Sequence, residues 1–446
     1  MRTITQAILV GLTLYSIPIV AQEKKTVFSL DEAIAYALEH NYQSINASRD
    51  MIDAQKQKWE TIASGLPQIS GMVNYQNQLK QPVAQIPAEF FGGESGEFAE
   101  VVFGQPQQLI ATATLRQQIF DGSYIVGVQA TKAFLRYSEN NKEKTDLEVR
   151  KAVVEAYGNV LLANESVFIL EKNVATLEKN LYESKKVFEN GLGDEESVDQ
   201  LQITLSSVNN QLKHGRRLKK ITLQMLNFMM GISLENPTEL TENLDTLTQS
   251  KIDRVILDSE LILTNNVDHK LITNLNEQRY FELKLAKSRI LPTLNAFINY
   301  GGQSFADQFT FFDRGQDWFA FSTFGVDLSV PIFSSLRRSA STQRAKIAYE
   351  QAKTQLTEVE EQINLQLKNA KSNYALAIEE YETSKDNLAL AERIESKNQI
   401  KYAEGLATSF ELRQAQTQLY ATQQEYLQAM VDVINNRTAL EIILNQ

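Results

Sequence analysis

The sequence contains no cysteine and only three histidines among its 446 residues. Disulfide bonds, thiolate metal sites and cysteine nucleophiles are therefore excluded. His40, His214 and His269 are scattered along the chain without the spacing that a metal site needs. No local motif assembles serine, aspartate and histidine into a catalytic triad. We therefore predict a protein that is not an enzyme and has no cofactor or metal ion.

Proline is rare, and basic residues are outnumbered by acidic ones. The eight prolines leave residues 107–236 and 332–446 without a single one, which permits long uninterrupted helices. The net charge is −11, from 44 basic and 55 acidic residues, and the basic residues form no cluster. This balance argues against nucleic-acid binding.

Long apolar runs are also missing beyond the N-terminus, so no transmembrane helix is predicted there. Residues 1–21 have the features of a signal peptide: Arg2 supplies positive charge, Ala7–Val20 is a short apolar core, and Ala21 offers a cleavage site. Without a cysteine after this core, a lipid anchor is excluded. The alternative is a buried N-terminal helix. We predict export, with residues 22–446 as a single domain.

Residues 121–188 contain a heptad pattern that starts at Val153, with apolar or small residues at two positions of each heptad. These are Val153, Val160, Val167, Val174, Leu181 and Phe188, with Ala156, Ala163, Leu170, Leu177 and Ser184. The pattern predicts a coiled-coil helix about 100 Å long. It ends at Gly191, and Asp194 can cap a returning helix that continues to about Met230. On this stretch alone, a coiled-coil rod without activity fits equally well.

Helical and strand-like periods alternate in the first third of the chain. Residues 29–66 are predicted to form an amphipathic helix, capped by Ser29 and Glu32. Apolar and polar residues then alternate, which predicts strands at about 68–78 and 108–119. A loop of some 30 residues, containing Phe90 and Phe91, is expected between them.

The second half of the chain repeats the first, at an offset of about 214 residues in its C-terminal part. Leu291-Pro292 corresponds to Leu66-Pro67, and Gly405-Leu406 corresponds to Gly191-Leu192. The predicted repeats span about 29–231 and 255–443, joined by a linker at 232–254, and the second repeat contributes strands at about 294–301 and 318–331. The chain is therefore a duplicated unit of two strands and one long helical hairpin.

Strands of roughly ten residues that alternate between apolar and polar side chains suit a membrane β-barrel with a wet lumen. Four strands cannot close a barrel, because an open edge would leave backbone groups unsatisfied in lipid. Two copies of the chain would give eight strands and a filled interior, whereas three would give twelve strands and a channel. We favour three copies; a small soluble sheet is the alternative.

The duplication, the Leu-Pro openings, the Ile-Phe entries to the long helices (Ile119-Phe120 and Ile332-Phe333) and the two Gly-Leu turns together resemble the TolC family. These proteins are outer-membrane channel components of tripartite efflux pumps and type I secretion systems. The resemblance implies a mainly α fold with a β-barrel contribution: a homotrimer with one twelve-stranded barrel in the outer membrane and an α-helical tunnel in the periplasm.

The same resemblance implies a passive exit duct that opens when a periplasmic adaptor (membrane fusion) protein docks, itself bound to an inner-membrane transporter. The rival interpretation is a secreted or periplasmic coiled-coil scaffold or adaptor protein without a pore. A scaffold would lack amphipathic barrel strands, and an adaptor usually carries one helical hairpin rather than two.

The resemblance also suggests functional residues. In the family, acidic side chains ring the periplasmic entrance; Glu411 matches the first acid, whereas Gln414 stands where a second is expected. The first turn adds acids at Asp194, Glu195, Glu196 and Asp199. Gly191, Leu192, Gly405 and Leu406 are the expected adaptor-docking tips, and Asp327 is expected to face the barrel lumen. Capping is the alternative role for Glu411, which is spaced from Thr408 as in a capping box.

Overall fold

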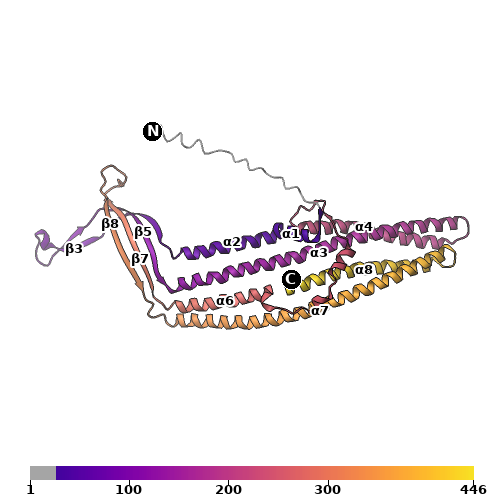
Figure 1. Ribbon diagram of the computed structural model, residues 1–446. Helices are drawn as coiled ribbons and strands as arrows, with labels where there is room; N and C mark the ends of the chain where they lie inside the picture. The colour runs from indigo at the N-terminus through magenta and orange to yellow at the C-terminus, as the bar shows by residue number, and fades with distance from the viewer. Residues whose placement is uncertain (1–26, 446) are drawn as a thin grey trace, which may run out of the picture. The chain divides into compact units, whose positions relative to one another are not determined.

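The computed structural model describes residues 27–445, which divide into two compact units (Figure 1). The first unit contains the described residues up to Asn41, with Ala152–Ile252 and Ala377–Asn435, and the second contains Tyr42–Lys151, Asp253–Leu376 and the C-terminal residues from Asn436. The long helices α3 (Gly122–Glu189) and α7 (Arg337–Ala403) contribute to both. The predicted signal peptide lies outside the described residues.

The second unit contains a four-stranded antiparallel sheet. Its strands are β2 (Gln68–Asn77), β5 (Gln107–Asp121), β7 (Thr293–Ala306) and β8 (Phe319–Ser329). They are ordered β2-β5-β7-β8, so strands from the two halves of the chain pair at the centre, and β2 and β8 are the edges. The sheet is thus open within one chain, and both of its edges can pair with further strands.

The strand register separates the side chains into two chemically different faces. One face carries Ile69, Val73, Leu109, Ala113, Leu115, Ile298, Tyr300, Phe324, Val326 and Leu328; the other carries Gln68, Ser70, Asn74, Thr112, Thr114, Asn295, Asn299, Thr323 and Asp327. A hydrogen bond of 2.8 Å from the Thr114 hydroxyl to Asn299 Oδ1 joins two strands across the polar face. Ile69 and Phe324 on the apolar face are 79% and 70% exposed. An apolar face this exposed suits contact with lipid.

The loop expected between the first two strands has structure of its own. It contains a two-stranded hairpin of β3 (Val83–Pro87) and β4 (Phe98–Val102), with a 3-10 turn, η1 (Ala88–Phe91), between them. The loop was predicted as irregular because its Gly, Pro and Glu content masks a short period-two pattern.

The predicted helix at residues 29–66 is two helices, α1 (Leu30–His40) and α2 (Tyr42–Ala63). The prediction of one helix was wrong because Asn41 takes an extended backbone conformation. Its side-chain amide donates a 2.7 Å hydrogen bond to the Met229 carbonyl, a contact between residues far apart in the chain. Ser29 and Glu32 do form the capping box at the start of α1.

Helices of the second unit continue from the strands. They are α2, the first part of α3, α6 (Val267–Ser288), the first part of α7 and the last turns of α8 (Ser409–Leu444). Arg437 on α8 binds Glu441 (Nε to Oε1, 2.9 Å) and Asp253 (Nη1 to Oδ2, 3.3 Å). Arg150 on α3 reaches the other Glu441 oxygen at 3.2 Å. Charged groups from three chain segments therefore meet in one network.

The first unit contains the rest of α3 and α7, the return helices α4 (Glu195–Met229) and α8, and small elements from the linker. The linker elements are β6 (Glu239–Leu240), which pairs with β1 (Val27–Phe28), and α5 (Leu244–Lys251), while the 3-10 turns η2 (Arg254–Asp258) and η3 (Leu263–Asn265) follow in the second unit. The predicted seam of α3 packs against α4 in a buried apolar core: Val167, Leu170, Val174, Leu177, Leu181, Leu201, Leu205, Val208 and Leu212.

Among residues 27–445, one helix, α3, contains an 18-residue stretch that is long and apolar enough to cross a membrane. More than half of this stretch is buried inside the protein. The burial is what a coiled-coil core produces, because its seam residues are apolar for packing against neighbouring helices.

Candidate channel face and helical turns

The two helical turns of the first unit have the same backbone structure. Gly191 and Gly405 adopt left-handed conformations, with φ of 76° and 72°. In each turn the following leucine donates its backbone N–H to a carbonyl five residues earlier, Leu192 to Val187 at 3.1 Å and Leu406 to Lys401 at 2.7 Å. This is the Schellman cap, in which glycine accepts a conformation that strains other residues. The repeated sequence therefore builds the same turn twice.

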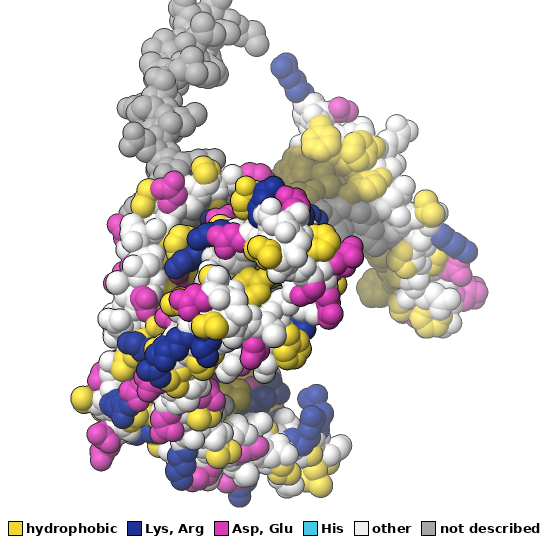
Figure 2. Space-filling view, turned by 90° about the vertical axis from the view of Figure 1, so that its right-hand side faces the viewer, with side chains coloured by type: hydrophobic (Ala, Val, Ile, Leu, Met, Phe, Trp, Pro, Cys, Tyr) yellow, Lys and Arg dark blue, Asp and Glu magenta, His cyan; other side chains and the backbone are white. Residues whose placement is uncertain are grey.

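The turns present apolar side chains beside a hollow. Leu192 is 83% exposed and Leu406 is 73% exposed. A hollow of about 880 Å³ lies between the turns, and Leu192, Asp194, Glu196, Gly405 and Phe410 are among its lining residues. Figure 2 shows the face that bears the turns, where hydrophobic, acidic and basic side chains are interspersed. Such a surface offers both apolar and polar contacts to a partner.

Asp194 and Glu411 cap the two return helices. Asp194 accepts the Ser197 backbone N–H at 2.6 Å, ahead of α4. Glu411 accepts the Thr408 backbone N–H at 2.7 Å, and the Glu411 N–H donates to the Thr408 hydroxyl at 3.3 Å, which forms the capping box. Both carboxyl groups have pKa values below their ordinary values, because backbone N–H groups donate to the charged form. Capping is thus one role of both residues.

These lowered pKa values predict how the caps respond to acid. A carboxyl group whose folded pKa is depressed stabilises the fold above its ordinary pKa, and loses that contribution as pH falls through the folded value. We expect the first turns of α4 and α8 to keep their amide protection from neutral pH down to the ordinary carboxyl range, and to lose it below. Hydrogen exchange at the Ser197 and Thr408 amides, which donate to the Asp194 and Glu411 carboxylates, measures this. Asp194→Asn and Glu411→Gln should each remove the pH dependence of amide protection from their own turn. If the pH dependence persisted in both variants, these two carboxyl groups would not be its cause.

The other residues expected at the entrance are exposed but differently placed. Glu195, Asp199 and Gln414 are exposed and do not line the hollow, and the same holds for Glu411. The structure therefore brings Asp194 and Glu196 of the first turn to the hollow, together with residues of the second turn, while the remaining predicted residues face solvent. Their role at an entrance depends on neighbouring copies of the chain.

Asp327 lies on the polar face of the sheet, as its place in the alternation predicts. It pairs with Asn295 in the register of β7 and β8 and is exposed. Arg116 lies on the same face, paired with Gln68 and Phe297. Sequence reasoning did not select Arg116 as a site residue, although the period-two pattern alone puts it on this face. The polar face therefore carries charges of both signs.

Polar contacts between the two hairpins were also missed. Asn173 donates to Gln423 at 3.0 Å, and the Ser197 and Ser409 hydroxyls are 3.0 Å apart. Within the second hairpin, burial raises the pKa of Glu395 on α7, whose carboxylate accepts a hydrogen bond from the fully buried Gln416 on α8. Polar residues at seam positions give no distinct signal in the sequence, because exposed helix faces contain the same residue types.

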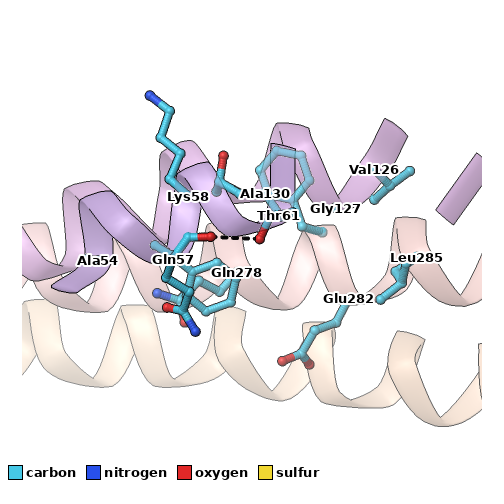
Figure 3. A pocket seen from close by; sticks show the side chains of 13 residues that line it. Ala54, Gln57, Lys58, Thr61, Val126, Gly127, Ala130, Gln278, Glu282 and Leu285 are labelled. Carbon is cyan, nitrogen blue, oxygen red and sulfur yellow. Dashed lines mark hydrogen bonds between the residues drawn. The ribbon is translucent and has the colours of Figure 1, made fainter. Parts of the chain in front are cut away.

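A separate cavity of about 290 Å³ lies between α2, α3 and α6 in the second unit (Figure 3). Val126, Ala130 and Leu285 contribute to its mainly apolar lining. The Thr61 hydroxyl donates to the Gln57 carbonyl at 3.0 Å, while Lys58 extends away from the other lining side chains. This lining offers apolar contact rather than a catalytic arrangement. Within residues 27–445 no three His, Asp or Glu side chains are grouped as ligands for a metal ion.

Comparisons with known proteins agree with this architecture. Residues 277–446 match the family of outer membrane efflux proteins. The alkaline protease secretion protein AprF of Pseudomonas aeruginosa is 23% identical over 334 residues, which are 73% of this chain and 67% of AprF.

Solved channels share the fold over nearly the whole chain. VceC of Vibrio cholerae is 16% identical, with a TM-score of 0.71 over 93% of this chain and 95% of VceC. CmeC of Campylobacter jejuni is 16% identical, with a TM-score of 0.72 over 93% of this chain and 85% of CmeC. The open state of MtrE of Neisseria gonorrhoeae is 15% identical, with a TM-score of 0.72 over 93% of this chain and 88% of MtrE.

A duplicated chain with a two-faced open sheet and two capped helical hairpins has the fold of the solved outer-membrane channels. The C-terminal residues 277–446 resemble the outer membrane efflux proteins, and the chain as a whole has the fold of the solved proteins named above. The predicted fold class, with long coiled-coil helices and barrel strands, is confirmed.

Proposed function

We propose that three copies of this chain form one passive exit duct, opened when a periplasmic adaptor protein docks at the Gly191 and Gly405 turns. The observation that carries the proposal is the pair of identical turns, each presenting an exposed leucine beside a shared hollow. An apolar side chain of a partner can enter the hollow, and the turn backbone is held rigidly by its caps. An inner-membrane transporter bound to the adaptor would supply the cargo and the energy.

The open sheet supports the proposed trimer. The free edges β2 and β8 cannot remain unpaired in lipid, and three copies close a barrel of twelve strands. The apolar face then contacts the outer-membrane lipid, and the polar face with Asp327 lines the lumen. The duct itself carries no catalytic activity in this proposal, since its task is to conduct.

Opening would occur by movement of one hairpin against the other. Within the first hairpin, α3 and α4 share a buried apolar core, which favours motion of the pair as one body. Between the hairpins, hydrogen bonds such as Asn173 to Gln423 and Ser409 to Gln200 join the helices. Side-chain hydrogen bonds of this kind contribute only about 0.5–1.5 kcal/mol each and can be exchanged for water as the helices shift. The structure therefore suits an iris-like opening.

Glu411, Gln414 and the first-turn acids Asp194, Glu195, Glu196 and Asp199 would ring the entrance in the trimer. Capping and lining are compatible, because a carboxylate that accepts one N–H keeps acceptor capacity toward the lumen. With Gln414 in place of a second acid, the ring holds less charge, and block by divalent cations should be weak.

Single-channel conductance in a planar bilayer tests the proposal. Purified protein should give discrete pores, and Mg²⁺ on the periplasmic side should reduce their conductance. Glu411→Ala should weaken this block if Glu411 lines the entrance. Thr408→Ala is the matched control, because it removes the other half of the capping box and keeps the acid.

Equal loss of block in both variants would assign Glu411 to capping alone. A stable protein that forms no pores would overturn the channel and favour the coiled-coil scaffold.

A further inference from the structure

The polar face of the sheet carries four phenylalanines. The register puts Phe297 and Phe305 of β7 and Phe319 and Phe321 of β8 on the face that also holds Asn299 and Thr323. A wet lumen gives no reason for large apolar side chains, whose exposure to water is unfavourable. We refer to these four residues as the aromatic band.

Two of the rings lie over glycines on the neighbouring strand. A Cβ atom added at Gly325 would lie 2.6 Å from Cε1 of Phe297, and one added at Gly301 would lie 2.9 Å from Cζ of Phe321. Each glycine pairs directly with the residue whose ring covers it. A side chain at Gly325 would displace the Phe297 ring, and one at Gly301 would meet the Ala111 carbonyl oxygen at 2.6 Å as well as the Phe321 ring. Because the glycines have no side chain, the rings can lie flat along the sheet, an arrangement known as aromatic rescue of a glycine.

The other two rings extend the band toward the β7–β8 loop. Phe305 and Phe319 have ring centroids 6.4 Å apart with an interplanar angle of 48°. Phe319 is 55% exposed, whereas Phe297 and Phe321 are partly buried. Rings held against the wall leave the lumen open while one side of each ring stays accessible. The band is a surface for contact with passing molecules rather than a plug.

Charges flank one end of the band. Arg116 pairs with Phe297, and Asp327 lies two residues beyond Gly325 on the same face. The two charges are opposite in sign, so this end of the band selects neither cations nor anions strongly. The shared feature of all four residues is an aromatic surface, which prefers apolar and aromatic groups at ring separations of about 4.5–7 Å.

We propose that the aromatic band is a transit site for aromatic and other apolar groups, carried either by small amphiphilic molecules or by side chains of an exported polypeptide. This inference rests on the proposed function, because it requires the polar face to line an open lumen. The three copies of the band would encircle the lumen and lower the free energy of an apolar group at that depth. Apolar groups of the cargo would then pass from one ring of the aromatic band to the next as the cargo crosses the outer membrane.

Block of single channels by shape-matched ions tests this site. Tetraphenylphosphonium and tetraphenylborate have the same aromatic shape and opposite charge, and tetraethylammonium has the charge without the rings. We expect both tetraphenyl ions to block wild-type pores more strongly than tetraethylammonium, relative to bilayers without protein. Phe321→Leu and Phe297→Leu keep an apolar side chain and remove the ring. Because three rings are lost per trimer, the blocking concentration should rise about tenfold, which corresponds to about 1.4 kcal/mol.

Phe324→Leu is the control, since Phe324 lies three residues from Phe321 on the opposite face of the same strand. Its pores should be blocked like those of the wild type. A peptide rich in phenylalanine and a matched peptide rich in serine then distinguish polypeptide side chains from small amphiphiles as the source of the apolar group.

Gly325→Ala offers a second measurement that does not depend on a blocker. It should push the Phe297 ring off the wall and lower the conductance of the unblocked pore, while the double variant Gly325→Ala with Phe297→Leu should recover it. Pores that are blocked equally in all variants would overturn the aromatic band and leave the channel intact. Absence of wild-type pores would overturn the proposed function, and this inference with it.

Discussion

Replacement of Phe324 by arginine is expected to abolish insertion of the protein into the outer membrane. Phe324 lies at the centre of β8, on the apolar face, beside its partner Ile298. An arginine on the lipid face at the bilayer midplane costs about 2–4 kcal/mol. Three copies in one trimer multiply this cost. Membrane fractionation followed by gel filtration of the detergent extract measures the loss of trimer.

The matched control is Thr323→Arg, one residue earlier and on the opposite face. Its guanidinium would lie in water inside the lumen, so the trimer should assemble normally. The added positive charges should move the ion selectivity of the pore toward anions, measured as a shift in reversal potential under a salt gradient. If Thr323→Arg blocked assembly and Phe324→Arg did not, the two faces would be assigned the wrong way round.

Arg437→Ala should cause the largest loss of stability in the helical part of the second unit. The side chains of Arg437 and Glu441 are 15% and 12% exposed, and their ion pair is 2.9 Å long. Removing one partner of such a pair leaves the other charge poorly compensated, which costs about 3–5 kcal/mol. Arg150 relieves part of this cost, because it also contacts Glu441. A lower midpoint of thermal unfolding in detergent is the expected result.

Arg216→Ala provides the comparison, since Arg216 and Glu171 form a pair of similar length, 2.8 Å, with side chains 60% and 47% exposed. Exposed pairs contribute at most about 1 kcal/mol, so this variant should unfold close to the wild-type temperature. If Arg437→Ala and Arg216→Ala lowered the unfolding midpoint equally, burial would not account for the contribution of the Arg437 ion pair. Arg437 also binds the Asp253 carbonyl at 3.3 Å, so a selective loss of protection around residue 253 would trace the effect to the linker.

The periodic parts of the chain could be predicted because period is a local property. Seam residues such as Val174 and Leu177 are buried at the positions that the heptads indicate. Asp327 faces the polar side of its strand because side chains alternate there. The Gly191 and Gly405 turns were visible for the same reason, since a helix that ends in a left-handed cap favours glycine at one position.

Contacts between distant segments were decided by the tertiary structure alone. The break at Asn41 depends on a carbonyl 188 residues away, and no helix-breaking residue marks it. The Arg437 network joins residues from the linker, α3 and α8, each of which looks like an ordinary surface charge in the sequence. The rings over Gly301 and Gly325 depend on the register of β7 and β8.

The amino-acid sequence by itself thus determined the duplicated plan, the long helices, the two-faced strands and the fold class, because these follow from repeated local patterns. Only the tertiary structure decided which charges are buried together and which aromatic rings lie on the polar face of the sheet. Such pairings depend on strand register and helix packing, in which residues hundreds of positions apart come within a few ångströms of one another.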